Sequence, residues 1–200
     1  MLKNRFSDYF LEAGTDEAGR GALAGPVVAA AVILPPSFSH PDLNDSKQIS
    51  EKKRHILREI IIRESLAWQV AFVSQYVIDK INILNASILA MHKALTYLSV
   101  RPEFIIVDGN RFKDFPGIAH RTIVDGDAQY MSIAAASILA KTFRDDFMKK
   151  IHVKYPCYLW AKNKGYATPQ HKKAILQHGI THYHRRSFHP NFPQLSLDFG

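Results

Sequence analysis

The residues best suited to chemistry are two adjacent acids, Asp16 and Glu17, followed by the segment Gly19-Arg20-Gly21. Two carboxylates fixed side by side repel each other and lose hydration when buried, so a divalent cation is needed to make the pair favourable. Glycine lets a backbone approach an anion closely, and arginine makes forked contacts with phosphate oxygens. Metal-holding acids beside a turn that suits phosphate predict phosphodiester chemistry.

A third acid, Asp108, follows the apolar residues 104–107 and precedes Gly109. A buried strand that ends here would place Asp108 at the carboxyl edge of a sheet, where α/β proteins assemble their sites. Asp-Gly is also a common turn pair, but together with Asp16 and Glu17 it predicts a shared metal site. Three or four carboxylates can hold two magnesium ions for phosphoryl chemistry, because their oxygens are hard ligands.

The geometry of this acid group leaves two alternatives open. Neighbouring strand residues face opposite sides, so Asp16 and Glu17 reach one ion only if the strand distorts or if one residue ligates through its carbonyl. A predicted helix over 129–151 offers a further acid, either Asp145 or Asp146. Successive helical side chains differ by about 100° in direction, so only one of the two would face the metals. Helical spacing does not choose between them.

The elements that position these acids follow from hydrophobic periodicity. The predicted strands span residues 12–18, 25–34, 66–74, 104–107 and 120–124, and the first two form a hairpin through the glycine-rich turn. The predicted helices start at Ser50, span about 77–98 with a break at Asn82 or Asn85, and span 129–151 and 169–178. A loop is predicted over 155–168. This order predicts an α/β protein with helices around a mixed sheet.

Composition limits the class of protein. The 200 residues, 46% of them hydrophobic, suit one domain with a real core. The chain has no apolar run of 18 residues, no signal-peptide pattern at its start and a single cysteine, and we therefore expect a cytoplasmic protein without membrane spans. The net charge of +8, with basic residues crowded into the last quarter, indicates a polyanionic partner.

Six segments resemble, in order, the motifs of the ribonuclease HII family. They are 16–21 (DEAGRG), 45–47 (DSK), 107–109 (VDG), 132–141 (SIAAASILAK) with Arg144-Asp145, 164–168 (KGYAT) and 184–188 (HRRSF). The resemblance implies a ribonuclease H-like α/β fold, in which a mixed five-stranded sheet is flanked by helices and followed by a small C-terminal helical extension. It implies one catalytic domain over residues 1–190 and a flexible tail over 191–200.

The same resemblance implies an endonuclease that hydrolyses RNA in RNA–DNA hybrids and incises 5′ to ribonucleotides embedded in duplex DNA. Two-metal-ion catalysis with Mg²⁺ or Mn²⁺ would leave 3′-hydroxyl and 5′-phosphate ends. The implied catalytic and metal-binding residues are Asp16, Glu17, Asp108 and Asp145, the last chosen over Asp146 by the Arg-Asp pair. The implied substrate-binding residues are Gly19, Arg20, Gly21, Ser46, Lys47, Tyr166, Arg185 and Arg186, with Tyr166 beside the 2′-hydroxyl that distinguishes RNA from DNA.

Other features depart from the family or extend it. Asp125 stands where a basic residue is usual, which leaves the roles of Asp125 and Asp127 open. The segment from Gln194 to Phe199 resembles the short peptide with which bacterial proteins bind the DNA sliding clamp. Two alternative functions stay open: a non-catalytic module that binds hybrids, and a nuclease of the same fold that acts on DNA.

Overall fold

The fold is built on an antiparallel hairpin of two strands, β1 (Glu12–Ala18) and β2 (Val27–Ile33). A computed structural model describes residues 2–43 and 49–188. The predicted hairpin is confirmed, with Asp16 opposite Ala30 across the pair. Every residue of β2 is buried, because helices cover both faces of the sheet at this strand.

Three further strands complete the mixed sheet, in the order β3-β2-β1-β4-β5. Strand β3 (Ala67–Val73) pairs antiparallel with β2, whereas β4 (Phe104–Asp108) and β5 (Ala119–Ile123) continue the sheet beyond β1 in parallel. The predicted mixed five-stranded sheet is therefore confirmed. Because β1, β4 and β5 run in the same direction, their carboxyl ends meet at one edge.

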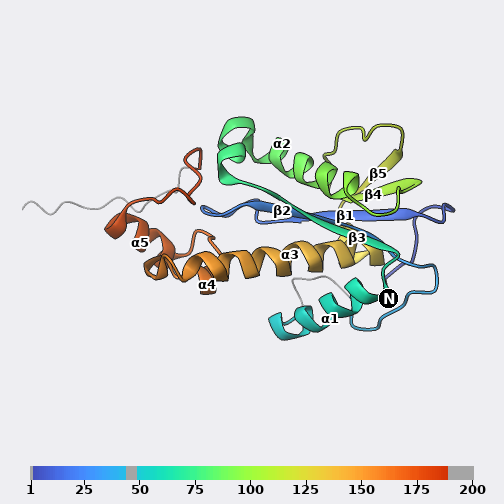
Figure 1. Cartoon of the computed structure of the whole chain (residues 1–200), viewed down its shortest axis with the longest axis horizontal. Coiled ribbons are helices and arrows are strands. Elements are labelled where there is room, and N and C mark those ends of the chain that lie inside the picture. The colour runs from blue at the N-terminus through green and yellow to red at the C-terminus, as the bar shows by residue number, and fades with distance from the viewer. Residues whose placement is uncertain (1, 44–48, 189–200) are drawn as a thin grey trace, which may run out of the picture.

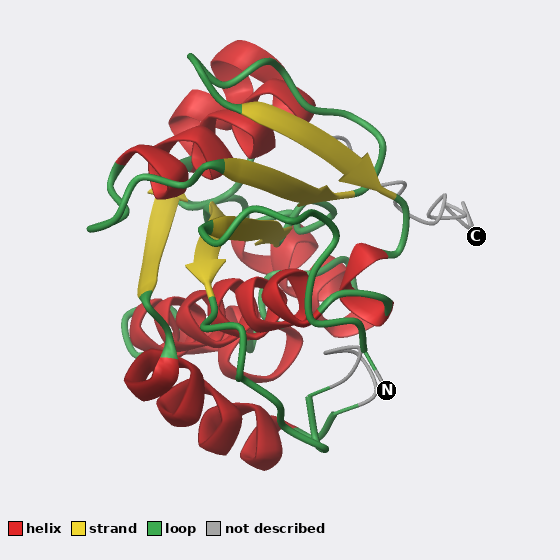
Figure 2. Cartoon of the chain, turned by 90° about the vertical axis from the view of Figure 1, so that its right-hand side faces the viewer, coloured by secondary structure: helices red, strands yellow, loops and turns green. Residues whose placement is uncertain are grey.

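Helices pack on the two faces of this sheet (Figure 1, Figure 2). Helix α2 (Gln75–Thr96) covers one face, and α1 (Glu51–Glu64) and α3 (Met131–His152) cover the other. Ser50 caps α1 by accepting a hydrogen bond from the backbone of Lys53, as the sequence predicts. The break predicted in α2 lies at Asn82, whose φ is 63°, and asparagine tolerates positive φ better than most residues.

Helix α3 lies unusually close to β1 because both elements offer small residues at the contact. Ala134, Ala135 and Ala136 are fully buried. A Cβ on Gly14 of β1 would lie 2.3 Å from the backbone carbon of Ser132, so only glycine fits here. This close packing brings the middle of α3 to the carboxyl end of β1.

The C-terminal part adds short helices beyond the far end of α3. They are η2 (Pro156–Tyr158), α4 (Trp160–Asn163) and α5 (Pro169–His178). The prediction of a continuous loop over 155–168 is therefore wrong. Trp160 is fully buried and stacks on Tyr158, and this packing orders the segment. No described helix is both long enough and apolar enough to span a bilayer.

Candidate active site

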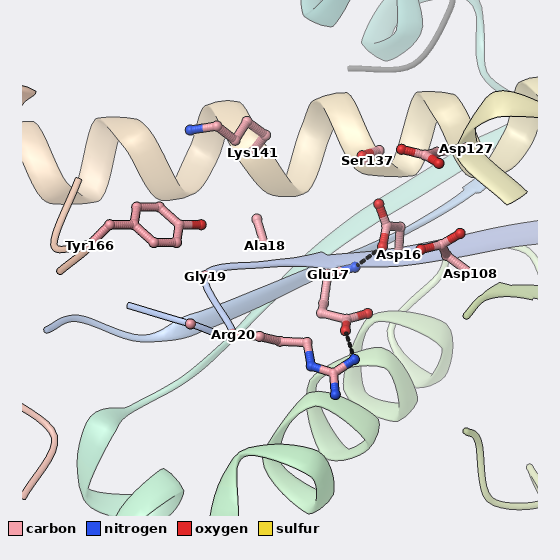
Figure 3. A pocket seen from close by; sticks show the side chains of 11 residues that line it. Asp16, Glu17, Ala18, Gly19, Arg20, Asp108, Asp127, Ser137, Lys141 and Tyr166 are labelled. Carbon is pink, nitrogen blue, oxygen red and sulfur yellow. Dashed lines mark hydrogen bonds and ion pairs between the residues drawn. The ribbon is translucent and has the colours of Figure 1, made fainter. Parts of the chain in front are cut away.

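A pocket of about 360 Å³ opens at the carboxyl ends of β1 and β4 (Figure 3). Its lining combines acids, a glycine-rich turn, a lysine and a tyrosine. The residues are Asp16, Glu17, Ala18, Gly19, Arg20, Gly21, Asp108, Asp127, Ser137, Lys141 and Tyr166.

Strand register brings the three acids predicted from the strands together. Thr15 of β1 pairs with Val107 of β4, so the next residues, Asp16 near the end of β1 and Asp108 at the end of β4, lie at the same level on neighbouring strands. The short 3-10 helix η1 (Gly126–Ala128) follows β5 and lies against this edge, where the amide of Gly126 donates to Asp108 Oδ1 over 2.8 Å. The pocket therefore lies at the sheet edge where the sequence places these acids.

Asp16 and Glu17 point to opposite sides of β1, as neighbouring strand residues do (Figure 3). Asp16 points toward α3, and its Oδ1 accepts the Glu17 amide over 2.6 Å. The Glu17 carboxylate pairs with Arg20, with 3.1 Å between Oε1 and Nη1. Both acids still border the pocket, because β1 ends at Ala18, one residue after Glu17.

Burial makes the charged form of these acids unfavourable. Burial raises the pKa of Asp16 well above its usual value, and the carboxylates of Glu17 and Asp108 raise it further, against a hydrogen bond from Ser137. Burial also raises the pKa of Glu17, against the opposing effect of Arg20. A bound divalent cation would relieve both penalties.

The donor set fits a hard divalent cation such as Mg²⁺ or Mn²⁺, because every acidic ligand offers carboxylate oxygens. Within residues 2–43 and 49–188, no three acidic, histidine or cysteine side chains already form a complete ligand group.

The fourth acid of the pocket is Asp127 of η1, which is 2% exposed. The structure does not bring Asp145 into the pocket lining; its side chain, 3% exposed, pairs with Lys141 at 2.5 Å. Asp146 pairs with Arg58 on the outer side of α3. A sequence signal for Asp127 does exist, because Gly126-Asp127 follows β5 much as Asp108-Gly109 ends β4.

The residues predicted to face the nucleotide divide into two groups. Gly19, Arg20, Gly21 and Tyr166 all line the pocket, and Tyr166 is joined to Ala22 by a β-bridge. Ser46 and Lys47 lie outside the described residues, as does the segment from Gln194 to Phe199.

Arg185 and Arg186 occupy different environments although they are adjacent. Arg186 is exposed, and its backbone amide donates to Asp79. Arg185 is only 2% exposed, and its guanidinium lies behind the glycine-rich turn, where it donates to backbone carbonyls. The structure therefore does not bring the Arg185 side chain to the surface that phosphate would approach.

A sheet of this order, with acids near the ends of adjacent parallel strands, has the ribonuclease H-like fold. The fold is similar to the ribonuclease H2 of Pyrococcus horikoshii OT3, with a TM-score of 0.76 and 26% identity over 90% of this chain and 94% of that one. It is also similar to the Archaeoglobus fulgidus protein in a structure described as a PCNA:RNase HII complex, with a TM-score of 0.75 and 25% identity over 92% and 98% of the two chains.

The sequence comparisons identify the family. The profile described as Ribonuclease HII matches residues 13–191. A Ribonuclease HII of Parabacteroides distasonis is 60% identical over 189 residues, which is 94% of this chain and 95% of that protein. The chain belongs to the ribonuclease HII family, a family of endoribonucleases, and the predicted family and fold class are confirmed.

Proposed function

We propose that this protein hydrolyses RNA in RNA–DNA hybrids and incises 5′ to single ribonucleotides in duplex DNA, leaving 3′-hydroxyl and 5′-phosphate ends. One observation carries the proposal: a single pocket combines the buried acids with Tyr166 and the turn 19–21. The acids can hold cations at a scissile phosphate, and the turn and the tyrosine can recognise the nucleotide beside it.

Asp16, Glu17, Asp108 and Asp127 would hold two Mg²⁺ or Mn²⁺ ions. Such ions activate the attacking water and stabilise the leaving oxygen. Asp145 would act from outside this group, by holding the Lys141 ammonium at the edge of the pocket over a 2.5 Å contact. Lys141 would then add positive charge next to the phosphate.

Arg20 exchanges partners in this proposal. Its guanidinium contacts Glu17 and its side chain is 53% exposed, so it is free to turn. With Glu17 engaged in holding a cation, Arg20 would turn to a phosphate oxygen, to which its guanidinium can donate forked hydrogen bonds. Tyr166 would pack on the sugar, where the 2′-hydroxyl alone distinguishes RNA from DNA.

We expect two partners, nucleic acid and the DNA sliding clamp. Beyond Tyr166, Lys172 and Lys173 of α5 border a second pocket of about 400 Å³ and would offer positive charge to the nucleic-acid backbone, so binding should weaken with salt. We also propose that the segment from Gln194 to Phe199 docks on the DNA sliding clamp in the cytoplasm. The Archaeoglobus fulgidus relative in complex with PCNA supports this kind of partner.

The test is cleavage mapping on matched duplexes with zero, one or four consecutive ribonucleotides, in Mg²⁺ or Mn²⁺. We expect incision only where ribonucleotides are present, and loss of incision in Asp16→Asn. The matched control is Asp114→Asn, since Asp114 is fully exposed outside the pocket lining, and it should cleave normally. Cleavage of the all-DNA duplex would favour a DNA nuclease, and tight binding without cleavage would favour a non-catalytic module.

A further inference from the structure

Two arginines are buried directly behind the pocket, Arg144 of α3 and Arg185 of the segment after α5, and they are 1% and 2% exposed. Within residues 2–43 and 49–188, every hydrogen bond from the two guanidinium groups goes to a backbone carbonyl. Arg185 donates to the carbonyls of Gly19 (2.7 Å), Arg20 (2.7 Å), Gly25 (3.0 Å) and Pro26 (3.2 Å).

Arg144 holds a second set of carbonyls and reaches the tyrosine of the pocket. It donates to the carbonyls of Pro26 (3.0 Å), Ala24 (3.1 Å) and Lys164 (2.9 Å). Its guanidinium carbon also lies 5.3 Å from the centre of the Tyr166 ring. The two arginines together connect the turn 19–21, the segment 24–26 and the loop that carries Tyr166.

Burying two charged guanidinium groups in the core costs free energy, because both lose their hydration. Neither guanidinium makes an ion pair within the described part of the chain, and burial lowers the pKa of both groups. Apolar side chains of similar volume often fill such space at lower cost. The forked geometry of the guanidinium, which fixes the direction of several carbonyls at once, is what an apolar replacement cannot supply.

The direction of these carbonyls fixes the direction of the amides in the turn. In a planar trans peptide the N–H points opposite to the C=O. Because the carbonyls of Gly19 and Arg20 point at Arg185, the amides of Arg20 and Gly21 point away from it. Both residues line the pocket, and two successive amides held in this way can bind an anion.

Gly19 packs directly against the Arg144 side chain, which leaves no room for a side chain at this position. Gly19 has a φ of +94°, and a Cβ there would lie 2.0 Å from Arg144 Nε. The Gly165 carbonyl accepts the amides of Leu23 and Ala24, which joins the turn to the Tyr166 loop. The turn, the loop and the arginines therefore form one packed unit.

We infer that Arg144 and Arg185 are positioning residues for ribonucleotide recognition: they set the amides of the turn and the ring of Tyr166 at the nucleotide beside the cut. The inference rests on the proposed function and deepens it. The arginines act through the backbone and through Tyr166, without touching the nucleic acid.

The test replaces each arginine with lysine, which keeps the charge and loses the fork. For Arg185→Lys and Arg144→Lys we expect kcat on the single-ribonucleotide duplex to fall by about 100-fold, the loss typical of a misplaced reacting geometry. The Kd for Mn²⁺, measured without nucleic acid, should stay the same. The amide NMR resonances of Arg20 and Gly21 should shift in Arg185→Lys.

The matched control is Arg58→Lys. Arg58 is also largely buried, pairs with Asp146 at 2.6 Å and lies 3.7 Å from the Phe143 ring centre, but it is outside the pocket lining. It should lose stability and keep kcat. The inference is overturned if Arg185→Lys keeps the wild-type kcat, or if Arg58→Lys loses as much kcat as the two test variants.

A second variant gives the same test without removing an arginine. Gly19→Ala places a methyl group against Arg144, and a kcat loss like that of Arg144→Lys supports the inference, whereas an unchanged kcat overturns it. Wild-type cleavage is measured first. If the wild type does not incise at ribonucleotides, the proposed function fails; if it does and the variants match it, only the positioning role fails.

Discussion

The substitution Asp145→Asn tests whether Asp145 of α3 holds Lys141 or binds the metal ion. Asp145 is buried, and its contact with Lys141 measures 2.5 Å. Removing one partner of a fully buried ion pair costs about 3–5 kcal/mol. Lys141 is 28% exposed and can turn toward water, so we expect a loss of about 2 kcal/mol in the free energy of unfolding.

The same substitution should leave metal binding almost unchanged, because Asp145 does not border the pocket. Asp127→Asn should do the opposite. It removes a carboxylate from the pocket, and we expect the affinity for Mn²⁺ to fall by about tenfold or more. The two variants therefore separate a residue that holds Lys141 from a residue that holds the ion.

The assays are urea unfolding and calorimetric titration with Mn²⁺ on both variants. Asp146→Asn serves as the control, since Asp146 is 45% exposed and its pair with Arg58 should be worth about 1 kcal/mol or less. If Asp145→Asn abolished Mn²⁺ binding and left the unfolding midpoint unchanged, Asp145 would be a ligand and the reasoning would be refuted.

Two further predictions concern stability. Gly14→Ala should lower the free energy of unfolding by about 1–3 kcal/mol, because its Cβ would lie 2.3 Å from the Ser132 backbone, whereas Gly21→Ala meets nothing within 4 Å; equal urea midpoints would contradict this. Burial and His171 lower the pKa of His184 from 6.5 to about 4, so the unfolded chain binds more protons between these values. The free energy of unfolding should therefore fall by on the order of 1–2 kcal/mol as the pH drops from 6.5 to 4. His184→Gln should make the urea midpoint less dependent on pH over this range.

Much of the fold could be predicted from the sequence, because local patterns determine it. The apolar run of β2 next to a Gly-Arg-Gly turn predicts the hairpin, and the Asp108-Gly109 pair marks the end of β4. The spacing of apolar residues predicts the helices and the cap at Ser50. The three acids of β1 and β4 follow from these elements, since parallel strands end at the same edge.

The parts that sequence reasoning missed depend on tertiary contacts. The Gly126-Asp127 pair after β5 marks Asp127 as a candidate, but Asp127 reaches the pocket only because η1 packs against the end of β4, which is a tertiary contact. The many basic residues around Arg185 predict an exposed side chain that contacts phosphate, but in the fold this side chain is buried. The helices within 155–168 form because Trp160 is buried against the C-terminal part.

We propose that the carboxylates of Asp16, Glu17, Asp108 and Asp127 together bind divalent cations. The most direct test is a crystal soaked in Mn²⁺, with an anomalous difference map calculated at the pocket. We expect manganese peaks within coordination distance of carboxylates from β1, β4 and η1, and no peak at the Lys141–Asp145 pair. A map without manganese between these carboxylates, in crystals saturated with the ion, would contradict it.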